Sequence, residues 1–455
     1  MNHYLINTTC GPIQGRAGQV KNVVAYLGIR YATAGRWEYP VQVRHWENTY
    51  DATDFGHCCY QPRAFHDESQ DNDFYYKEFR KDELYTYSED CLFLNIWTPV
   101  TAKDGDRLPV LVFIHGGGYT GGCGHEKHLN RPIWPTKGVI AVTINYRLGP
   151  LGFLCLPELV QEAGHTGNYA LYDQMTALCW IRDNISAFGG DPNNVTIMGQ
   201  SAGAMSVQYL SMSPLTDGLF HKAVMSSGGV NKLFAPIRPE VTFDFWHMVM
   251  ERSGCKNLAE FRVLPAERLF EAWQSAAKDV KGSLRAIAAC LDGKMVTGTA
   301  KEILQVGSQK NIPYLAGSTS EDALPPMMFH MGKKWCTTQA LQGKQPSFTW
   351  FFDRQLPGDK HGAWHSSDLW YWFGTLDNSW RPMTEKDYSL SNLMTDYLTN
   401  FAKTGNPNGP GLPVWEAMSS TQKKVNCFGE GTPHMSRVNQ LKLIAATFSS
   451  LNMGG

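Results

Sequence analysis

The stretch Val195-Thr196-Ile197-Met198-Gly199-Gln200-Ser201-Ala202-Gly203-Ala204 decides how the rest of the chain is interpreted. Its first four residues are apolar or β-branched and predict a short buried strand. A Gly-x-Ser-x-Gly turn follows, and the next residues predict a helix. Strand, tight turn and helix in this order are typical of a nucleophile elbow, which presents a serine hydroxyl above a sheet. Gly199 and Gly203 flank the serine because a Cβ atom at either position would clash across the turn.

Ser201 is therefore a candidate nucleophile. It would lie at the N-terminus of a helix, where the helix dipole and free N–H groups favour a developing negative charge. An ordinary Gly-Ser turn would show the same pattern, so further motifs are needed to distinguish a nucleophile elbow from such a turn. A catalytic serine needs a base to take its proton and an acid to orient that base. On a hydrolase sheet, the acid and then the histidine follow the serine along the chain.

An acid and a histidine follow Ser201 in this order. A predicted strand over Pro313–Ser318 runs into Glu321 and Asp322, and a later loop carries His365. His361 is a competing base, and its alternative is a solvated polar residue.

A second glycine-rich run supplies candidate donors for an oxyanion. Gly116-Gly117-Gly118 directly follows the apolar strand predicted over Pro109–Ile114, and its N–H groups are not shielded by side chains. Ala202 offers a further N–H as the residue after the serine. Two independent motifs after two strands strongly favour a nucleophile at Ser201.

The order of elements predicts an α/β fold. Apolar strands over Pro109–Ile114 and Val139–Ile144 are followed by a helix predicted from about Tyr169 to Ala187, and then by the elbow. Strands that alternate with helices imply a large, mostly parallel, twisted sheet covered by helices on both faces. The aromatic-rich segment 37–87 is predicted to be an ordered loop, whose rings either wall a pocket or pack the loop onto the body.

Composition restricts the class of partner. The chain has 455 residues, with 41 Lys and Arg against 42 Asp and Glu, so nothing favours nucleic acid or another polyanion. We expect no membrane insertion and a cytoplasmic protein, because no long apolar run and no secretory signal are visible. The 11 cysteines are scattered without metal-binding spacing, so we expect no metal site. The oligomeric state, monomer or dimer, does not follow from the sequence.

Several motifs together resemble the type-B carboxylesterases, of the carboxylesterase/cholinesterase family of α/β hydrolases. The motifs span residues 26–32, 88–97, 115–119, 145–149, 152–154, 167–174, 188–192 and 401–407, besides the elbow. The resemblance implies one α/β-hydrolase domain over 1–455, with helical insertions at about 232–310 and 323–385 around an active-site gorge. It also implies hydrolysis of small-molecule carboxylic esters through an acyl-serine, with no metal and no organic cofactor.

The resemblance also assigns roles to residues. It places Ser201 on the nucleophile and His365 on the base, and it places the oxyanion donors on Gly117, Gly118 and Ala202. The family usually has Asp-Glu-Gly at the acid position, with the Glu catalytic. Here Glu321-Asp322-Ala323 puts Asp322 in that position, and Glu321 remains the alternative. Ser227 matches a serine that supports the triad by hydrogen bonding, or else is a simple turn residue.

Departures from the family pattern concern the substrate. Gln200 replaces a usual Glu before the nucleophile and removes a negative charge there. The segment 60–90 contains no Trp, so a tryptophan platform for choline is missing. We therefore expect choline esters to be poor substrates. The segment between Asp322 and His365 is also shorter than is common, which predicts a reduced helical cap and a gorge open to bulky or aryl esters.

The sequence leaves open the state of two cysteines and the choice between an esterase and related proteins. Cys59 and Cys91 fall where secreted family members form a disulfide, but two reduced thiols are favoured in a cytoplasmic chain. The alternatives to an esterase are a non-catalytic binding protein of the same fold, or a lipase or amidase. Non-catalytic members lack the serine or the histidine, and the chain shows no strongly apolar lid helix for a lipase.

Overall fold

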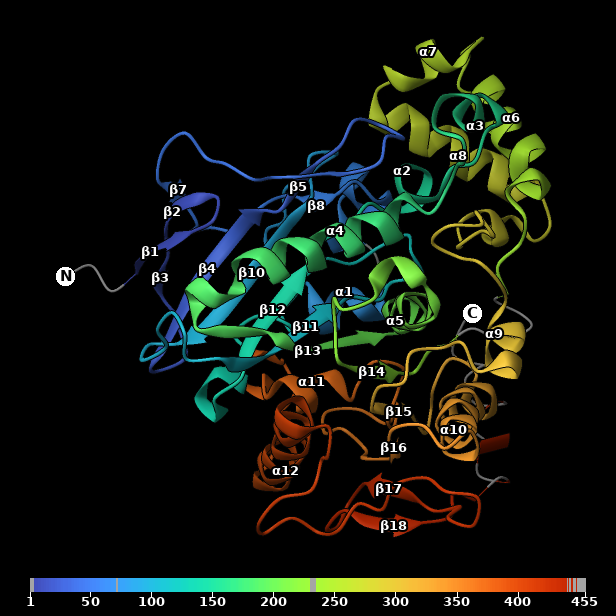
Figure 1. Ribbon diagram of the computed structural model, residues 1–455. Helices are drawn as coiled ribbons and strands as arrows, with labels where there is room; N and C mark the ends of the chain where they lie inside the picture. The colour runs from blue at the N-terminus through green and yellow to red at the C-terminus, as the bar shows by residue number, and fades with distance from the viewer. Residues whose placement is uncertain are drawn as a thin grey trace.

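The computed structural model describes residues 4–70, 73–229 and 235–439, together with 441, 443, 444 and 447. Within them, an 11-stranded sheet runs in the order β18-β17-β16-β15-β14-β13-β11-β12-β10-β4-β3 (Figure 1). Its strands are β3 (Arg16–Ala17), β4 (Val23–Arg30), β10 (Phe93–Pro99), β11 (Leu108–Ile114), β12 (Ile140–Ile144), β13 (Gly190–Gln200), β14 (Lys222–Ser226), β15 (Tyr314–Thr319), β16 (Ser347–Phe352), β17 (Val425–Phe428) and β18 (His434–Ser436).

The sheet is parallel in its centre and antiparallel at its edges. Every neighbouring pair from β12 to β17 is parallel, whereas β10 pairs antiparallel with β12 and β4, and β18 pairs antiparallel with β17. The predicted α/β class with a mostly parallel sheet is thereby confirmed. Parallel strands present their carboxyl ends at one edge of the sheet, where the segments after β11, β13 and β15 meet.

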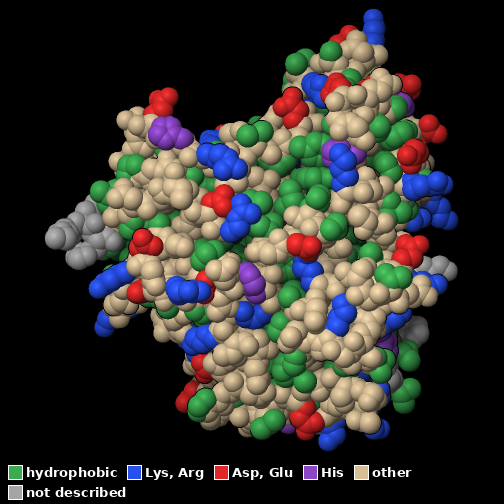
Figure 2. Space-filling model, in the orientation of Figure 1, with side chains coloured by type: hydrophobic (Ala, Val, Ile, Leu, Met, Phe, Trp, Pro, Cys, Tyr) green, Lys and Arg blue, Asp and Glu red, His purple; other side chains and the backbone are tan. Residues whose placement is uncertain are grey.

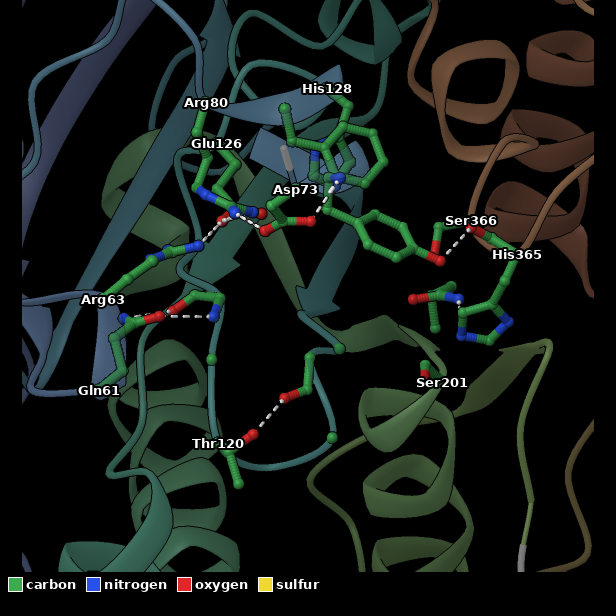
Figure 3. A pocket seen from close by; sticks show the side chains of 18 of the residues that line it. Gln61, Arg63, Asp73, Arg80, Thr120, Glu126, His128, Ser201, His365 and Ser366 are labelled. Atoms are coloured by element: carbon green, nitrogen blue, oxygen red, sulfur yellow. Dashed lines mark hydrogen bonds and ion pairs between the residues drawn. The ribbon is translucent and has the colours of Figure 1, made fainter. Parts of the chain in front are cut away.

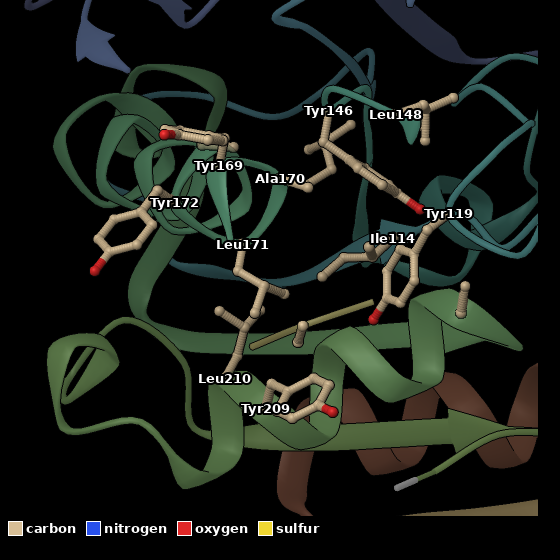
Figure 4. Packing of buried hydrophobic residues seen from close by; sticks show 14 of the residues in the cluster. Ile114, Tyr119, Tyr146, Leu148, Tyr169, Ala170, Leu171, Tyr172, Tyr209 and Leu210 are labelled. Atoms are coloured by element: carbon tan, nitrogen blue, oxygen red, sulfur yellow. The ribbon is translucent and has the colours of Figure 1, made fainter. Parts of the chain in front are cut away.

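Helices cover both faces of this sheet. Helices α4 (Tyr169–Asn184) and α5 (Ala202–Met212) pack on one face, and α11 (Leu369–Phe373) and α12 (Glu385–Thr404) pack on the other (Figure 1). Strand β11 shows why, because its alternate side chains point to opposite faces. Ile114 packs in the cluster that contains α4 and α5, close to Tyr119 and Tyr146 (Figure 4), whereas Phe113 packs with α11 and α12.

The segment predicted as a first helical insertion, 232–310, is described from residue 235, and 232–234 lie outside the described residues. It contains α6 (Phe243–Arg252), α7 (Leu258–Arg262), α8 (Ala266–Asp279) and α9 (Ala300–Val306). The first three gather with α3 (Pro157–Ala163) at the upper right of Figure 1.

The segment predicted as a second helical insertion, 323–385, is not helical throughout. It contains α10 (Pro325–Leu341) and α11, but β16 lies between them and pairs with both β15 and β17 in the central sheet. All six residues of β16 are buried, so its short apolar run lacks the alternation that marks a strand with one exposed face.

Smaller elements lie around the N-terminal half. They are β1 (Leu5–Thr8), β2 (Gly11–Gln14), β5 (Ala32–Thr33), β6 (Val41–Gln42), β7 (Tyr50–Asp51), β8 (Cys58–Cys59), β9 (Tyr87–Ser88), α1 (Phe74–Phe79) and α2 (Gly149–Phe153). The rings of the aromatic-rich segment 37–87 both line a cavity and pack the loop onto the body. Tyr75 and Phe79 line the main cavity, whereas Tyr60 and Phe65 stack on each other and pack against the core.

The surface charge on one face is mixed (Figure 2), and the described helices are not of the membrane-spanning kind. On the face seen in Figure 2, Lys and Arg side chains are interspersed with Asp and Glu. Among the described helices, none is both long enough and apolar enough to cross a membrane.

Candidate active site

Ser201 lies in a tight turn between β13 and α5. Its φ of 55° and ψ of −122° are unusual for a residue with a side chain. The two flanking glycines permit this turn, as the sequence predicts. A Cβ atom on Gly199 would lie 2.2 Å from the carbonyl oxygen of Gly203, and a Cβ atom on Gly203 would lie 2.0 Å from that of Ile114. The turn thus brings α5 against β11 and leaves Ser201 at the wall of a cavity.

Asp322 and His365 meet through a short hydrogen bond. The distance from His365 Nδ1 to Asp322 Oδ1 is 2.5 Å. Asp322 follows β15 and is fully buried, and its carboxylate also accepts hydrogen bonds from Thr319 and from the backbone N–H of Ala323. These contacts hold the carboxylate in one orientation, so that it can fix the ring of His365.

The charges of this pair shift both pKa values. Burial alone would raise the pKa of Asp322, but the positive charge and hydrogen bond of His365 bring it below its ordinary value. Burial alone would lower the pKa of His365, but the Asp322 carboxylate raises it above its ordinary value. The carboxylate therefore stabilises the protonated ring that a general base forms when it accepts a proton.

The competing residues have other partners. His361 Nδ1 lies 2.9 Å from Asp359 Oδ2, and its side chain is 42 % exposed. Glu321 Oε2 accepts a hydrogen bond of 2.8 Å from the backbone N–H of Ala363. Of the two adjacent carboxylates, the structure therefore brings Asp322, and not Glu321, to His365.

Gln200 contacts the other nitrogen of His365. Its Nε2 lies 3.1 Å from His365 Nε2, the nitrogen that a hydroxyl nucleophile would approach. With Nδ1–H directed at Asp322, Nε2 carries a lone pair and accepts from the Gln200 amide. Within the described part of the chain, Ser201 Oγ makes no hydrogen bond to the ring, although Ser201 and His365 line the same cavity (Figure 3).

The glycine-rich loop after β11 presents free backbone donors to the cavity. Gly117 and Gly118 have φ values of 99° and 61°, and both line the cavity. A Cβ atom on Gly117 would lie 2.2 Å from the carbonyl oxygen of Gly121, so only glycine fits there. Over the described residues, the N–H groups of Gly117 and Gly118 donate no backbone hydrogen bond. Ala202 begins α5 directly after Ser201, at the positive end of the helix dipole.

Two adjacent serines at the end of β14, Ser226 and Ser227, differ in their hydrogen bonding. Ser227 Oγ is buried and has no hydrogen-bond partner of good geometry among the described residues, although it lies near enough to Asp322 to lower the pKa of that carboxyl. Ser226 Oγ instead donates to Asp368 Oδ2 at 2.7 Å. Burial raises the pKa of Asp368 to about 6. Ser226 and Asp368 were not predicted from the sequence, where the only signal was the position of Asp368, three residues after His365.

The cavity in front of Ser201 has a volume of about 550 Å³. One part of its wall is apolar and aromatic, formed by Tyr75, Phe79, Phe113 and Leu369. Another part is charged, and the sequence analysis missed it. Its residues are Arg63, Glu68, Asp73, Arg80 and Glu126. All but Glu68 are labelled in Figure 3.

The charged residues of the cavity wall pair with one another. Arg63 Nη1 lies 2.8 Å from Glu126 Oε1, and Arg80 lies 2.7 Å from Glu68 and 2.8 Å from Asp73. The Arg63–Glu126 pair fixes the segment between β8 and β9 against the chain that follows the glycine-rich loop, and the two pairs of Arg80 hold that segment together internally. They also give the cavity polar groups that an entirely aromatic gorge would not have.

A model of the carboxylesterase family matches residues 2–335 and 322–443 of the chain, which together include all the residues of the site. The chain belongs to the carboxylesterase family. Para-nitrobenzyl esterase of Bacillus subtilis is 30% identical to it over 467 aligned residues, covering 90% of this chain and 91% of the relative. Liver carboxylesterase 1F of Rattus norvegicus is 28% identical, covering 90% and 88%. A solved structure of PNB esterase superposes with a TM-score of 0.84 at 27% identity, covering 98% of this chain and 99% of that one.

Membership of the family makes the chain a carboxylic ester hydrolase with the α/β-hydrolase fold. This confirms the resemblance drawn from the motifs. Neither Cys59 nor Cys91 is in a disulfide in the structure, and both side chains are buried.

A buried ion pair fixes the cavity wall of this carboxylesterase. Helix α1 carries Tyr75 and Phe79 into the wall, and its Glu78 pairs with Arg381 at 2.8 Å with both side chains fully buried. Arg381 also donates to the carbonyl oxygen of Pro357 at 2.9 Å. The pair therefore joins α1 to the segment that precedes His365.

We expect the substitution Arg381→Met to lower the free energy of unfolding by about 3–5 kcal/mol, because it removes the positive charge that pairs with the buried Glu78 carboxylate and leaves it only the hydrogen bond from the Trp380 indole. Urea denaturation of the two proteins measures the difference. Arg107→Met is the matched control, since Arg107 pairs with Asp191 while 68% exposed, and its loss should cost at most about 1 kcal/mol. Equal losses in the two variants would contradict the prediction.

Proposed function

We propose that this carboxylesterase hydrolyses carboxylic esters through an acyl-serine intermediate on Ser201. The observation that carries the proposal is the 2.5 Å hydrogen bond between Asp322 and His365, at the cavity that Ser201 also lines. Folding does not require an acid, a base and a strained serine from three separate segments to lie at one cavity. Acyl transfer requires all three there.

In the proposed reaction, His365 Nε2 takes the proton of Ser201 as Oγ attacks the ester carbonyl. The N–H groups of Gly117, Gly118 and Ala202 stabilise the oxyanion. The protonated His365 then gives its proton to the leaving alcohol, and the acyl group stays on the serine. In the second half, His365 takes a proton from the water that attacks the acyl carbonyl. The protonated His365 then returns this proton to Ser201 Oγ as the acid is released.

Asp322 would hold the Nδ1–H tautomer of His365 and stabilise its charged form throughout. Gln200 has to turn away from Nε2 before Ser201 can donate to it, because one lone pair cannot accept both donors. We assign Ser227 a supporting role through its proximity to Asp322. The whole chain acts as one hydrolase domain in this proposal. Segment 323–385 contributes His365, Ser366 and Leu369 to the cavity lining, whereas the described residues 235–310 contribute none.

Bulky or aryl esters are the proposed substrates, and choline esters are disfavoured. Tyr75 and Phe79 offer a surface against which an aromatic group can pack. The relative para-nitrobenzyl esterase takes its name from an ester of an aromatic alcohol. Among the described residues that line the cavity there is no Trp, and Gln200 adds no negative charge for a quaternary ammonium. The cytoplasmic location inferred from the sequence stays a prediction.

A substrate series tests the proposed preference. We expect kcat/KM for para-nitrophenyl and para-nitrobenzyl esters to exceed kcat/KM for acetylcholine. The kcat/KM for acetylcholine should also not exceed that for 3,3-dimethylbutyl acetate, its uncharged isostere. In Gln200→Glu, the new carboxylate should raise the ratio of acetylcholine to the isostere by about fivefold or more. Wild-type preference for acetylcholine, or an unchanged ratio in Gln200→Glu, would contradict the assignment.

A further inference from the structure

Three potential metal ligands lie together behind the cavity wall. They are Cys58 on β8 and Cys123 and His125 in the chain that follows the glycine-rich loop. Their ligand atoms all lie within 4.8 Å of one another, and all three side chains are buried. The sequence analysis expects no metal site. It missed this group because Cys58 is far along the chain from the Cys123-Gly124-His125 run, and only the fold brings them together.

The distance between Cys58 and His125 matches two ligands of a tetrahedral zinc ion. Cys58 Sγ lies 3.6 Å from His125 Nε2. Zinc bonds of about 2.3 Å to sulfur and about 2.05 Å to nitrogen, at a tetrahedral angle, place the two ligand atoms about 3.6 Å apart. Phe55 stacks on the His125 ring at a centroid distance of 4.4 Å and an interplanar angle of 8°, so the ring is held in this orientation.

The two thiols also differ from three other buried thiols of the chain. Cys10, Cys290 and Cys336 each direct their sulfur to a backbone carbonyl oxygen, at 3.4 to 3.5 Å. Over the described residues, Cys58 and Cys123 have no carbonyl acceptor of this kind. Cys58 instead faces His125, and both sulfurs belong to the ligand group.

We propose that Cys58, Cys123 and His125 bind one Zn²⁺ ion, with a water molecule as the fourth ligand. Two thiolates and an imidazole are soft and borderline donors that suit zinc. Binding displaces the two thiol protons to solvent, and the two thiolates then balance the charge of the ion. The buried complex therefore carries no net charge, which removes the main cost of placing an ion away from water.

The zinc would join two segments that form the cavity wall. Gln61, two residues after β8, already accepts from the N–H of Gly122 at 2.9 Å and donates to its carbonyl oxygen at 3.2 Å (Figure 3). Cys123 follows Gly122 directly. A metal bridge from Cys58 to Cys123 and His125 would join the same pair of segments through metal–ligand bonds. Its role is structural and lies outside the ester reaction.

Metal analysis of the full-length protein tests the proposal. Protein purified under reducing conditions from zinc-supplemented medium should contain about one zinc per chain by mass spectrometry of the elements. After removal of zinc, titration with Co²⁺ should produce the intense near-ultraviolet sulfur-to-cobalt absorption of a thiolate complex, saturating at about one equivalent. Wild-type protein that binds neither ion would overturn the proposal.

Variants separate this site from adventitious binding. Cys58→Ser and Cys123→Ser should each reduce zinc to background and abolish the cobalt absorption, whereas Cys255→Ser, a half-buried cysteine outside the group, should leave both unchanged. Circular dichroism checks that each variant is folded, and the wild-type titration stands even if one is not. A wild-type mass lower by two hydrogens, with two fewer titratable thiols that involve Cys58 and Cys123, would show a disulfide and overturn the proposal.

Discussion

Replacing Ser201 with alanine is expected to reduce kcat for ester hydrolysis by about 10⁶-fold, since serine hydrolases lose a factor of this size with their nucleophile. Alanine keeps the Cβ atom, so the turn at φ 55° stays as it is in the native protein. Wild-type enzyme mixed with para-nitrophenyl acetate should release a burst of para-nitrophenol equal to the enzyme concentration. Its intact mass should rise by one acetyl group. Ser201→Ala should show neither.

Ser389→Ala is the matched control, because Ser389 is an exposed serine on α12, outside the cavity lining. It should retain both the burst and the acetylated mass. If Ser201→Ala retained either signal, another residue would carry the acyl group. A wild-type protein without measurable turnover would instead support a binding protein of this fold.

The second large effect is expected for Asp322→Asn. An amide in place of the carboxylate removes the charge that orients His365 and favours the wrong tautomer, which costs about 10⁴-fold in kcat in a serine triad. The pH dependence of kcat/KM should also change in Asp322→Asn. Only neutral His365 can accept a proton, so kcat/KM falls as the pH drops through the pKa of His365. Asp322 raises that pKa, and without it burial dominates, so the acidic limb should shift to lower pH.

Glu321→Gln is the comparison for Asp322→Asn. The two carboxylates are adjacent in sequence, but Glu321 bonds to the backbone of Ala363 and does not contact His365. The variant should keep the pH profile of the wild type and lose far less activity. A larger loss, or a shifted acidic limb, in Glu321→Gln than in Asp322→Asn would reverse the assignment of the acid.

The features predicted well from the sequence depend on local geometry. The turn at Ser201 requires Gly199 and Gly203 for steric reasons that a few residues specify, and the structure shows both close approaches. The carboxyl ends of parallel strands meet at one edge, so motifs placed after β11, β13 and β15 could be expected to converge. The choice between Asp322 and Glu321 needed the family pattern, because composition and spacing treat two adjacent acids alike.

The features that were missed depend on contacts between distant segments. Arg63 and Glu126 form an ion pair in the cavity wall, yet each looks like an ordinary surface charge in the sequence. Strand β16 is buried on both faces, so it shows no alternation, and only its partners β15 and β17 make it a strand. Gln200 was recognised as a missing charge, but its contact with His365 depends on a side-chain orientation that no sequence pattern specifies.

The strand order has a consequence for how activity is acquired during folding. Ser201 follows β13, Asp322 follows β15 and His365 follows β16, while β14 and β15 are neighbours joined through the long segment 227–313. Closing so long a segment has an entropic cost that must be met before the parallel pair forms. A chain in which α4 and α5 had docked without β15 would hold its serine but lack both the acid and the base. Regain of esterase activity would therefore report the addition of β15 and β16 to the sheet, later than signals from helix formation.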